Sequence, residues 1–272
     1  RRYVFGLGAR QVALCLTVSG VAAWLFGQPP AAAIAIGGAL SLSSTAIVMP
    51  ILAEQKRQHS MAGRATLSLL LFQDLAVAPF LLTLTLLGRR GGEDFSSPSV
   101  LLSLLPAVLG VAFLFAFGRL LLRPMLRSVA RAKSEELFLA ACLLVVVGAG
   151  LVSALTGLSM ALGAFIAGLL LAETEFRHEV ETRVEPFKGL LLGLFFLSVG
   201  IGLNLSLLAD RPLVILGMAV GMILLNGGVV FGLARAFGLT SRSAIESALL
   251  LAGGGEFAFV ILSTGMNGGI VA

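Results

Sequence analysis

An acidic side chain lies in the middle of an apolar stretch. Residues 65–88 read ATLSLLLFQDLAVAPFLLTLTLLG, a run long enough to cross a bilayer, with Gln73 and Asp74 inside it. At a rise of 1.5 Å per residue, Asp74 lies roughly 15 Å from the start of the run, near the midplane of a hydrocarbon core about 30 Å thick. A carboxylate at that depth costs about 2.5–3.5 kcal/mol on insertion scales. Asp74 is therefore a candidate carrier of a proton or a cation; the alternative is a protonated group that only hydrogen-bonds a neighbouring helix.

Two other apolar spans are interrupted by residues that disfavour a helix. The span 31–53 has a pair of glycines at 37–38, and a cluster of hydroxyl side chains follows at Ser41, Ser43, Ser44 and Thr45. The span 244–266 contains three glycines at 253–255, followed directly by Glu256 at a depth of roughly 18 Å. Glycine weakens a helix, and hydroxyls replace lost backbone partners or supply oxygen ligands to a cation. The alternative for each glycine cluster is a close helix–helix contact.

The order of the interrupted spans adds information. They are the second and the ninth apolar spans of the chain, so an alternating bundle runs them in opposite directions. Two such spans of opposite direction are typical of the midplane site of an inverted-repeat transporter. Half-helix N-termini offer positive dipole ends there, and unwound carbonyl groups offer cation ligands. With Asp74 on the third span, the pattern favours a cation carrier.

Composition indicates a membrane protein. Of the 272 residues, 58% are hydrophobic and 12% are charged, and the mean hydropathy is +1.02. These values lie far from those of a soluble domain. We therefore expect an all-α polytopic membrane protein in which residues 1–272 form a single transmembrane transporter domain. Nine spans are expected, at about 7–26, 31–53, 65–88, 99–122, 136–154, 158–173, 187–207, 212–234 and 244–266.

The basic residues predict the orientation of the spans. With the N-terminus inside, all of the 19 Lys and Arg residues except Arg89, Arg90 and Arg211 fall on inner segments. The net charge of +5 therefore reports topology, and we expect no nucleic-acid partner. Cys15 and Cys142 lie in apolar spans without metal-ligand spacing, and the sequence has no phosphate loop, nucleophile elbow or zinc motif. The chain is predicted to be no enzyme, with no catalytic residue and no resident cofactor.

Four stretches resemble the monovalent cation:proton antiporter family of the sodium/hydrogen exchanger superfamily, above all its Kef-type potassium efflux branch. They are LSSTAIVMPIL (42–52), GRATLSLLLFQDLAVAPFLL (63–82), the segment 157–203 and GGEFAFVIL (254–262). The resemblance implies a bundle of about thirteen spans with inverted repeats, two crossed discontinuous helices and a dimerisation domain. This chain would cover spans four to twelve, so we expect missing helices at both ends, and a homodimer in the lipid bilayer.

The resemblance also implies roles for individual residues in the ion-binding core. The ion- and proton-binding positions are Asp74 as the carrier carboxylate, Gln73 beside it, Ser43, Ser44 and Thr45 on the first crossing helix, and Glu256 on the second. Of these, Asp74 and Thr45 are the expected metal ligands, the metal being the transported monovalent cation.

A charged inner stretch, EFRHEVETRVEPFKG (175–189), resembles the regulatory loop of the Kef-type branch. In that branch the loop contacts a nucleotide-binding regulatory domain that senses glutathione adducts, and no such domain is expected in these residues. The candidate regulatory positions are His178, Glu181, Arg183 and Glu185. Arg183 stands where the branch usually has an acidic residue, so a solvated linker is an equal interpretation.

Together these features predict a secondary active transporter that exchanges K⁺ or Na⁺ for H⁺ by alternating access. Burial favours the neutral, protonated form of Asp74 and a bound cation favours the charged form, so the two compete for one site. Oxygens of Ser44, Thr45 and Gln73, with freed carbonyls, would complete a shell that suits a hard cation. The alternatives are a gated potassium channel on the same scaffold and a cation-binding membrane sensor that transports nothing. The expected location is the bacterial inner (cytoplasmic) membrane.

Overall fold

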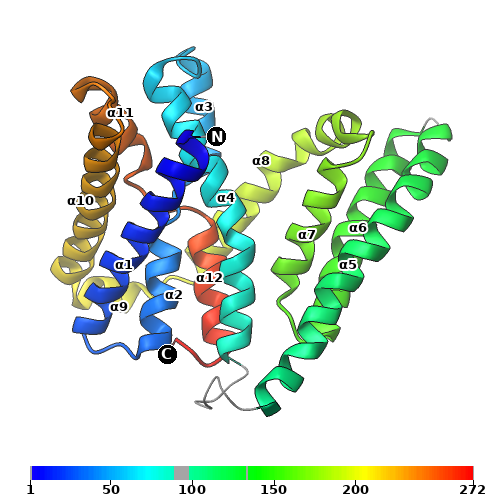
Figure 1. The fold of residues 1–272 in the computed structure, drawn as a ribbon, viewed down its shortest axis with the longest axis horizontal. Helices are drawn as coiled ribbons and strands as arrows, with labels where there is room; N and C mark the ends of the chain where they lie inside the picture. The colour runs from blue at the N-terminus through cyan, green and yellow to red at the C-terminus, as the bar shows by residue number, and fades with distance from the viewer. Residues whose placement is uncertain (1, 89–97, 133, 272) are drawn as a thin grey trace. The chain divides into compact units, whose positions relative to one another are not determined.

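The computed structural model describes residues 2–88, 98–132 and 134–271, and all regular secondary structure in these residues is helical (Figure 1). The elements in chain order are a π-helix η1 (Arg2–Gly8) and the α-helices α1 (Ala9–Leu25), α2 (Pro30–Leu40), α3 (Thr45–Glu54), α4 (Met61–Gly88), α5 (Pro98–Arg131), α6 (Glu135–Leu155), α7 (Met160–Ala172), α8 (Arg177–Ile201), α9 (Leu205–Asp210), α10 (Pro212–Ala236), α11 (Ser241–Leu251) and α12 (Phe257–Asn267). The prediction of an all-α chain is confirmed.

Seven segments of the described chain are long and apolar enough to cross a membrane: Val4–Leu25, Pro30–Glu54, Met61–Thr85, Leu109–Arg131, Glu135–Leu155, Arg177–Ile201 and Pro212–Ala236. The chain is therefore a polytopic helical membrane protein. Two of the nine expected spans correspond to shorter helices. The 13 residues of α7 extend for about 20 Å, less than a hydrocarbon core. The last expected span is divided between α11 and α12.

The chain forms two compact units. The first contains Arg1–Gly91 and Arg211–Ala272, and the second contains Gly92–Asp210. The chain thus leaves the first unit after α4 and returns to it with α10. All six residues predicted to bind ions lie in the first unit.

In the first unit, a short non-helical segment at 41–44 separates α2 from α3. The amide nitrogen of Ser41 still donates to the helical carbonyl of Gly37, and the Ser41 hydroxyl donates to the Gly38 carbonyl at 2.8 Å. Hydroxyl groups that bond the nearby backbone in this way compete with helix continuation. Ser44 is extended, with φ −77° and ψ 108°, and α3 begins at the next residue, Thr45.

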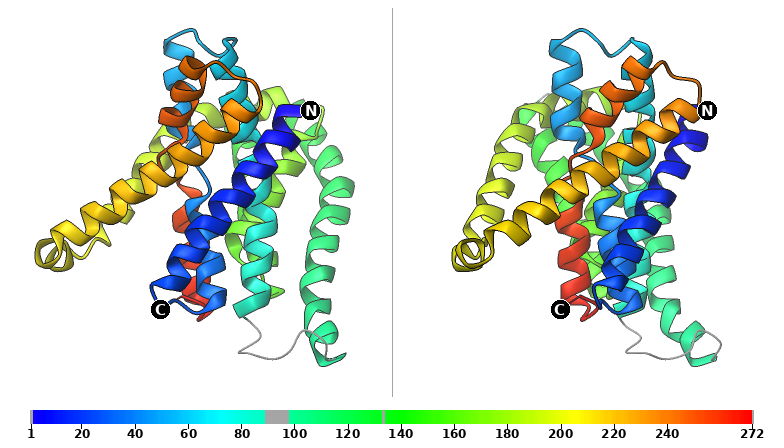
Figure 2. Two further views of the ribbon diagram at one scale, coloured as in Figure 1. Left: turned by 60° about the vertical axis from the view of Figure 1, so that its left-hand side comes forward. Right: turned by 90° about the vertical axis from the view of Figure 1, so that its left-hand side faces the viewer.

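A second break, at 252–256, separates α11 from α12 and crosses the first break. Figures 1 and 2 show α3 and α11 on one side of the crossing and α2 and α12 on the other, so the two broken helices run in opposite directions. The amide nitrogen of Gly255 donates to the carbonyl of Leu42 at 2.9 Å. A Cβ atom at Gly255 would lie 2.7 Å from the Ser43 carbonyl oxygen. Only glycine therefore permits this backbone contact.

The glycine pair of the second expected span does not form the break. A Cβ atom at Gly37 would lie 2.4 Å from the carbonyl oxygen of Leu16, because α2 packs closely against α1 at this point. Gly37 is thus a helix–helix contact, the alternative interpretation of this pair. The break begins only at 41, where the hydroxyl cluster starts.

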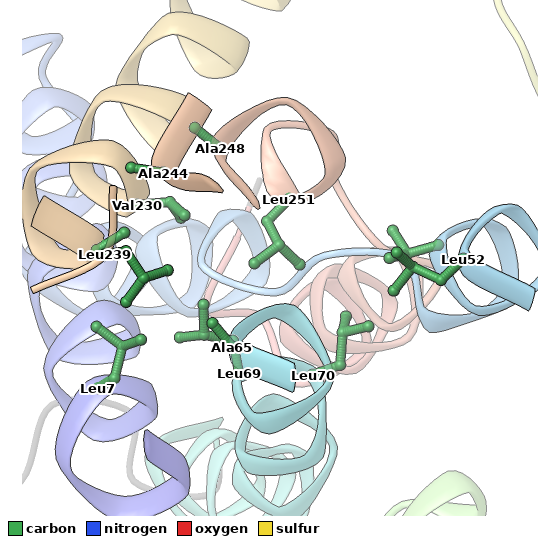
Figure 3. Packing of buried hydrophobic residues seen from close by; sticks show 12 residues of the cluster. Leu7, Leu52, Ala65, Leu69, Leu70, Val230, Leu239, Ala244, Ala248 and Leu251 are labelled. Carbon is green, nitrogen blue, oxygen red and sulfur yellow. The ribbon is translucent and has the colours of Figure 1, made fainter. Parts of the chain in front are cut away.

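A cluster of buried apolar side chains holds α3, α4, α10 and α11 together at one end of the first unit (Figure 3). Leu251 is fully buried in it at the last position of α11, directly before the second break. Leu52 brings α3 into the cluster, and Leu69 and Leu70 bring α4. The cluster therefore fixes the half-helices α3 and α11 against the continuous helix α4.

Replacing Leu251 with Ala is expected to lower the free energy of unfolding by about 2–5 kcal/mol, because it leaves a cavity beside the break. Thermal unfolding in detergent measures this change. The matched control is Leu249→Ala on the same helix, where the side chain is 74% exposed and its loss leaves no cavity. Equal destabilisation by the two substitutions would contradict this account of the cluster.

The second unit contains α5 to α9, and two ion pairs connect α5 to the segment between α7 and α8. Arg119 and Arg127 of α5 pair with Glu173 and Glu175 at 3.2 and 2.9 Å. The helix α8 begins at Arg177 rather than near 187, where the apolar span was expected. Its first turns consist of charged residues that are compatible with a helix, so hydropathy alone marks the span but misses this polar extension.

Candidate ion-binding site at the crossed helix breaks

Asp74 faces the start of α3. It lies half-buried in the middle of the continuous helix α4. The Thr45 hydroxyl donates to its carboxylate, at 3.1 Å from Oδ1 and 3.4 Å from Oδ2. Thr45 is the first residue of α3, so the positive end of that helix dipole lies beside the carboxylate. Among the described residues, Thr45 is the only hydrogen-bond donor to Asp74, which leaves carboxylate lone pairs for a proton or a cation.

A second carboxylate joins the site from the other broken helix. Glu256 directly precedes α12, and its Oε2 accepts a hydrogen bond from the Ser44 hydroxyl at 2.8 Å. Ser44 is buried and Glu256 is half-buried. Asp74 and Glu256 interact electrostatically as like charges when both are ionised. The adjacent residues Ser44 and Thr45 thus each contact one of two acidic groups from different helices.

Gln73 and Ser43 are engaged with the backbone at the breaks. Gln73 is 1% exposed, and its Oε1 accepts from the amide nitrogen of Ser43 at 3.0 Å. Its Nε2 donates to Gln11 Oε1 at 2.8 Å. The Ser43 hydroxyl donates to the carbonyl of Leu251, the last residue of α11, at 2.8 Å. Both side chains thereby connect the first break to its surroundings.

Four carbonyl groups at the breaks already accept hydrogen bonds from the protein. The acceptor–donor pairs are Leu40 with Asn226 Nδ2, Ser41 with Gln11 Nε2, Leu42 with the Gly255 amide, and Leu251 with the Ser43 hydroxyl. Buried carbonyls require such partners, and here side chains and the opposite break supply them. These four carbonyls are therefore less available to a cation than the carboxylate and hydroxyl oxygens of the site.

Gln11 and Asn226 were not among the residues predicted from the sequence to bind ions. Each is an uncharged amide inside an apolar helix, Gln11 in α1 and Asn226 in α10, and each is 1% exposed. A buried amide without a partner is costly, so an isolated amide in an apolar span is the signal that identifies such residues. The Asn226 Oδ1 atom has no partner in the described structure.

The candidate regulatory residues belong to the second unit of the chain. His178, Glu181, Arg183 and Glu185 occupy the first turns of α8, in the second unit. Arg183 forms an ion pair with Glu135 at the start of α6. The segment expected as a loop is thus a helical extension joined to its own unit. The structure brings together the six predicted ion-binding residues in the first unit, and these four belong to the second unit.

The architecture and the site define an integral membrane protein with two acidic groups at a crossing of broken helices. The family described as "Sodium/hydrogen exchanger, transmembrane" matches residues 1–272. The chain therefore belongs to the sodium/hydrogen exchanger family. Membership of this transporter family supports the prediction that the chain is no enzyme.

Two curated plant proteins are similar to the whole chain. K(+) efflux antiporter 1, chloroplastic, from Arabidopsis thaliana is 45% identical over 278 residues, which cover 100% of this chain and 23% of that protein. K(+) efflux antiporter 2, chloroplastic, from the same organism is 44% identical and covered to 24%. This chain thus spans about a quarter of the length of these relatives. The predicted resemblance to potassium efflux antiporters is confirmed.

Proposed function

We propose that this chain is the ion-translocating part of an antiporter that exchanges a monovalent cation, K⁺ in the first instance, for H⁺. The observation that carries the proposal is the half-buried carboxylate of Asp74, which accepts a hydrogen bond from Thr45 at the start of a half-helix. The family match and the similarity to proteins named as K⁺ efflux antiporters support it. The Na⁺ form of the same exchange is an outcome of the test below.

Competition at Asp74 would couple the two ions. In its protonated form the carboxyl is neutral and holds one proton. Loss of that proton leaves a negative charge that binds one cation, so the site carries the same net charge in either state. The Thr45 hydroxyl, which donates to the carboxylate here, has oxygen lone pairs with which it would coordinate the cation. Exchange at this group alone is therefore electroneutral.

The helix dipoles make a small net contribution at the crossing. The C-terminal ends of α2 and α11 and the N-terminal ends of α3 and α12 meet there. Each pair of opposite ends carries partial charges of about −0.5 and +0.5, which compensate one another. The charge of the site is then set by its side chains, Asp74 and Glu256. We propose that Ser44 and Glu256 complete the oxygen shell around the cation.

The opposite directions of the two broken helices support the proposal of inverted repeats, and alternating access would expose the crossing to each face in turn. The single transporter domain with nine spans is proposed from the apolar runs of the sequence, and the total of about thirteen spans in the complete protein from the family resemblance. The homodimer, the bacterial inner membrane and a regulatory role for the start of α8 are proposals that rest on the family resemblance. The relatives' names place those two proteins in chloroplasts.

The full-length protein, reconstituted in proteoliposomes with a pH-sensitive dye, is expected to dissipate an imposed proton gradient when K⁺ is added. Parallel additions of Na⁺ and Li⁺ show which cation the protein exchanges for protons. A saturable, cation-dependent dye signal supports the carrier. A cation current that is insensitive to the pH gradient would instead identify a channel. Saturable cation binding without any flux would identify a sensor.

A further inference from the structure

Two glutamine side chains hydrogen-bond each other inside the first unit. Gln11 comes from α1 and Gln73 from α4, and each is 1% exposed. The Gln73 Nε2 atom donates to Gln11 Oε1 at 2.8 Å. Two amides are costly to bury unless their polar atoms are paired. Their presence here therefore suggests a role that a pair of apolar side chains would not fulfil.

The remaining polar atoms of the pair bind the backbone of the first break. Gln11 Nε2 donates to the Ser41 carbonyl at 3.1 Å, and Gln73 Oε1 accepts from the Ser43 amide at 3.0 Å. The pair therefore satisfies one acceptor and one donor of a segment that has no helical partners for them. Ser44 and Thr45, whose hydroxyls contact Glu256 and Asp74, follow directly in the chain.

Gln73 and Asp74 point in different directions because consecutive residues of a helix diverge by about 100°. Gln73 contacts Gln11 on α1, whereas Asp74 contacts Thr45 on α3. Each polar atom of the Gln73 amide already has a protein partner, since Nε2 also lies 3.4 Å from the Ser43 hydroxyl. The amide is thus committed to the protein rather than to the space beside Asp74.

We propose that Gln11 and Gln73 form a clamp on the break between α2 and α3 and are positioning residues rather than cation ligands. The clamp holds the segment 41–44 so that the hydroxyls of Ser44 and Thr45 are in place before the cation arrives. This inference rests on the proposed exchange function. Ligands that are ordered before binding spare the cost of ordering them during binding, so loss of the clamp weakens cation binding more than turnover.

The test compares Gln11→Met, Gln73→Met and the double variant in the full-length protein in proteoliposomes. Each single substitution is expected to raise the KM for K⁺ at least about tenfold, with kcat changed less than about twofold. Because the two side chains act as one unit, the double variant is expected to have a KM within about twofold of the more affected single variant. An unchanged KM, or KM factors that multiply in the double variant, would overturn the clamp.

A second readout follows the break itself. Hydrogen–deuterium exchange is expected to be faster in peptides covering 41–45 in Gln11→Met than in the unmodified protein. The Ser43 amide donates to Gln73, and the substitution removes the hydrogen bond with which Gln11 holds Gln73 in place. Unchanged exchange in this segment would overturn the clamp even in a protein that transports nothing. If Gln11→Met does not fold, Gln11→Asn takes its place, since its shorter side chain cannot reach both Ser41 and Gln73.

The matched control is Thr66→Val on α4. The Thr66 hydroxyl is fully buried and has no hydrogen-bond partner in the described structure. Its removal is expected to leave both the KM and the exchange of 41–45 unchanged, and a rise equal to that of Gln11→Met would show that any buried polar loss in this unit suffices. If the unmodified protein transports neither K⁺ nor H⁺, the proposed function is refuted. The hydrogen–deuterium measurement would still test the clamp in that case.

Discussion

Asp74→Asn is expected to abolish cation-coupled proton flux while the protein remains folded. The amide is nearly isosteric with the carboxylate, and its oxygen still accepts the hydrogen bond from Thr45. It binds no proton, and it offers no negative charge to a cation removed from water. Loss of a charged ligand of this kind costs about 3 kcal/mol or more, which corresponds to at least about a hundredfold in rate.

The measurement is the dye assay in proteoliposomes, with K⁺ as the added cation. Asp210→Asn, which changes the same chemical group at the exposed end of α9, serves as the control and should transport normally. A monodisperse Asp74→Asn protein that still exchanges K⁺ for protons at more than a tenth of the normal rate would contradict the assignment of Asp74 as the carrier.

The second large effect is expected from Gly255→Ala. The added Cβ would lie 2.7 Å from the carbonyl oxygen and 2.8 Å from the carbonyl carbon of Ser43. Backbone atoms cannot swing away as a flexible side chain does, so the two breaks must separate. The hydrogen bonds from Gly255 to Leu42 and from Ser44 to Glu256 lengthen as a result. Such overpacking costs about 1–3 kcal/mol, and transport should fall more than about tenfold.

Gly253→Ala supplies a matched control within the same run of glycines. A Cβ atom at Gly253 would meet no atom within 4 Å, and its effect should be much smaller than that of Gly255→Ala. Thermal unfolding in detergent and the dye assay should rank the two variants in the same order. Similar loss in both variants would show that backbone flexibility in this run matters more than the close approach at Gly255.

The central elements of the site can be predicted from the sequence because they are polar or helix-weakening residues within apolar spans. Asp74 is visible as an acid in an apolar run, and the glycines before Glu256 mark a weak point in a helix. The first break was predicted less accurately, since Gly37 suggested an interruption and instead supports the contact with α1. A glycine in an apolar helix serves either purpose, and only the position of the neighbouring helix distinguishes them.

The contribution of Gln11 was missed. An amide in an apolar span marks a buried polar group, but its partner Gln73 lies 62 positions away and no pattern in the sequence indicates that pairing. The charged start of α8 was missed for a related reason, because hydropathy finds the apolar part of a helix and not its polar extension.

The return of the chain to the first unit has a consequence for biosynthesis. The Ser43 hydroxyl bonds a carbonyl 208 positions later, and the Ser44 hydroxyl bonds a carboxylate 212 positions later. The ribosome therefore releases the first four helices long before their final partners exist. Until α11 and α12 insert, these hydroxyls need other partners, such as water or nearby backbone carbonyls. Nascent chains arrested before α11 should consequently lack an assembled crossing, however well their early helices have inserted.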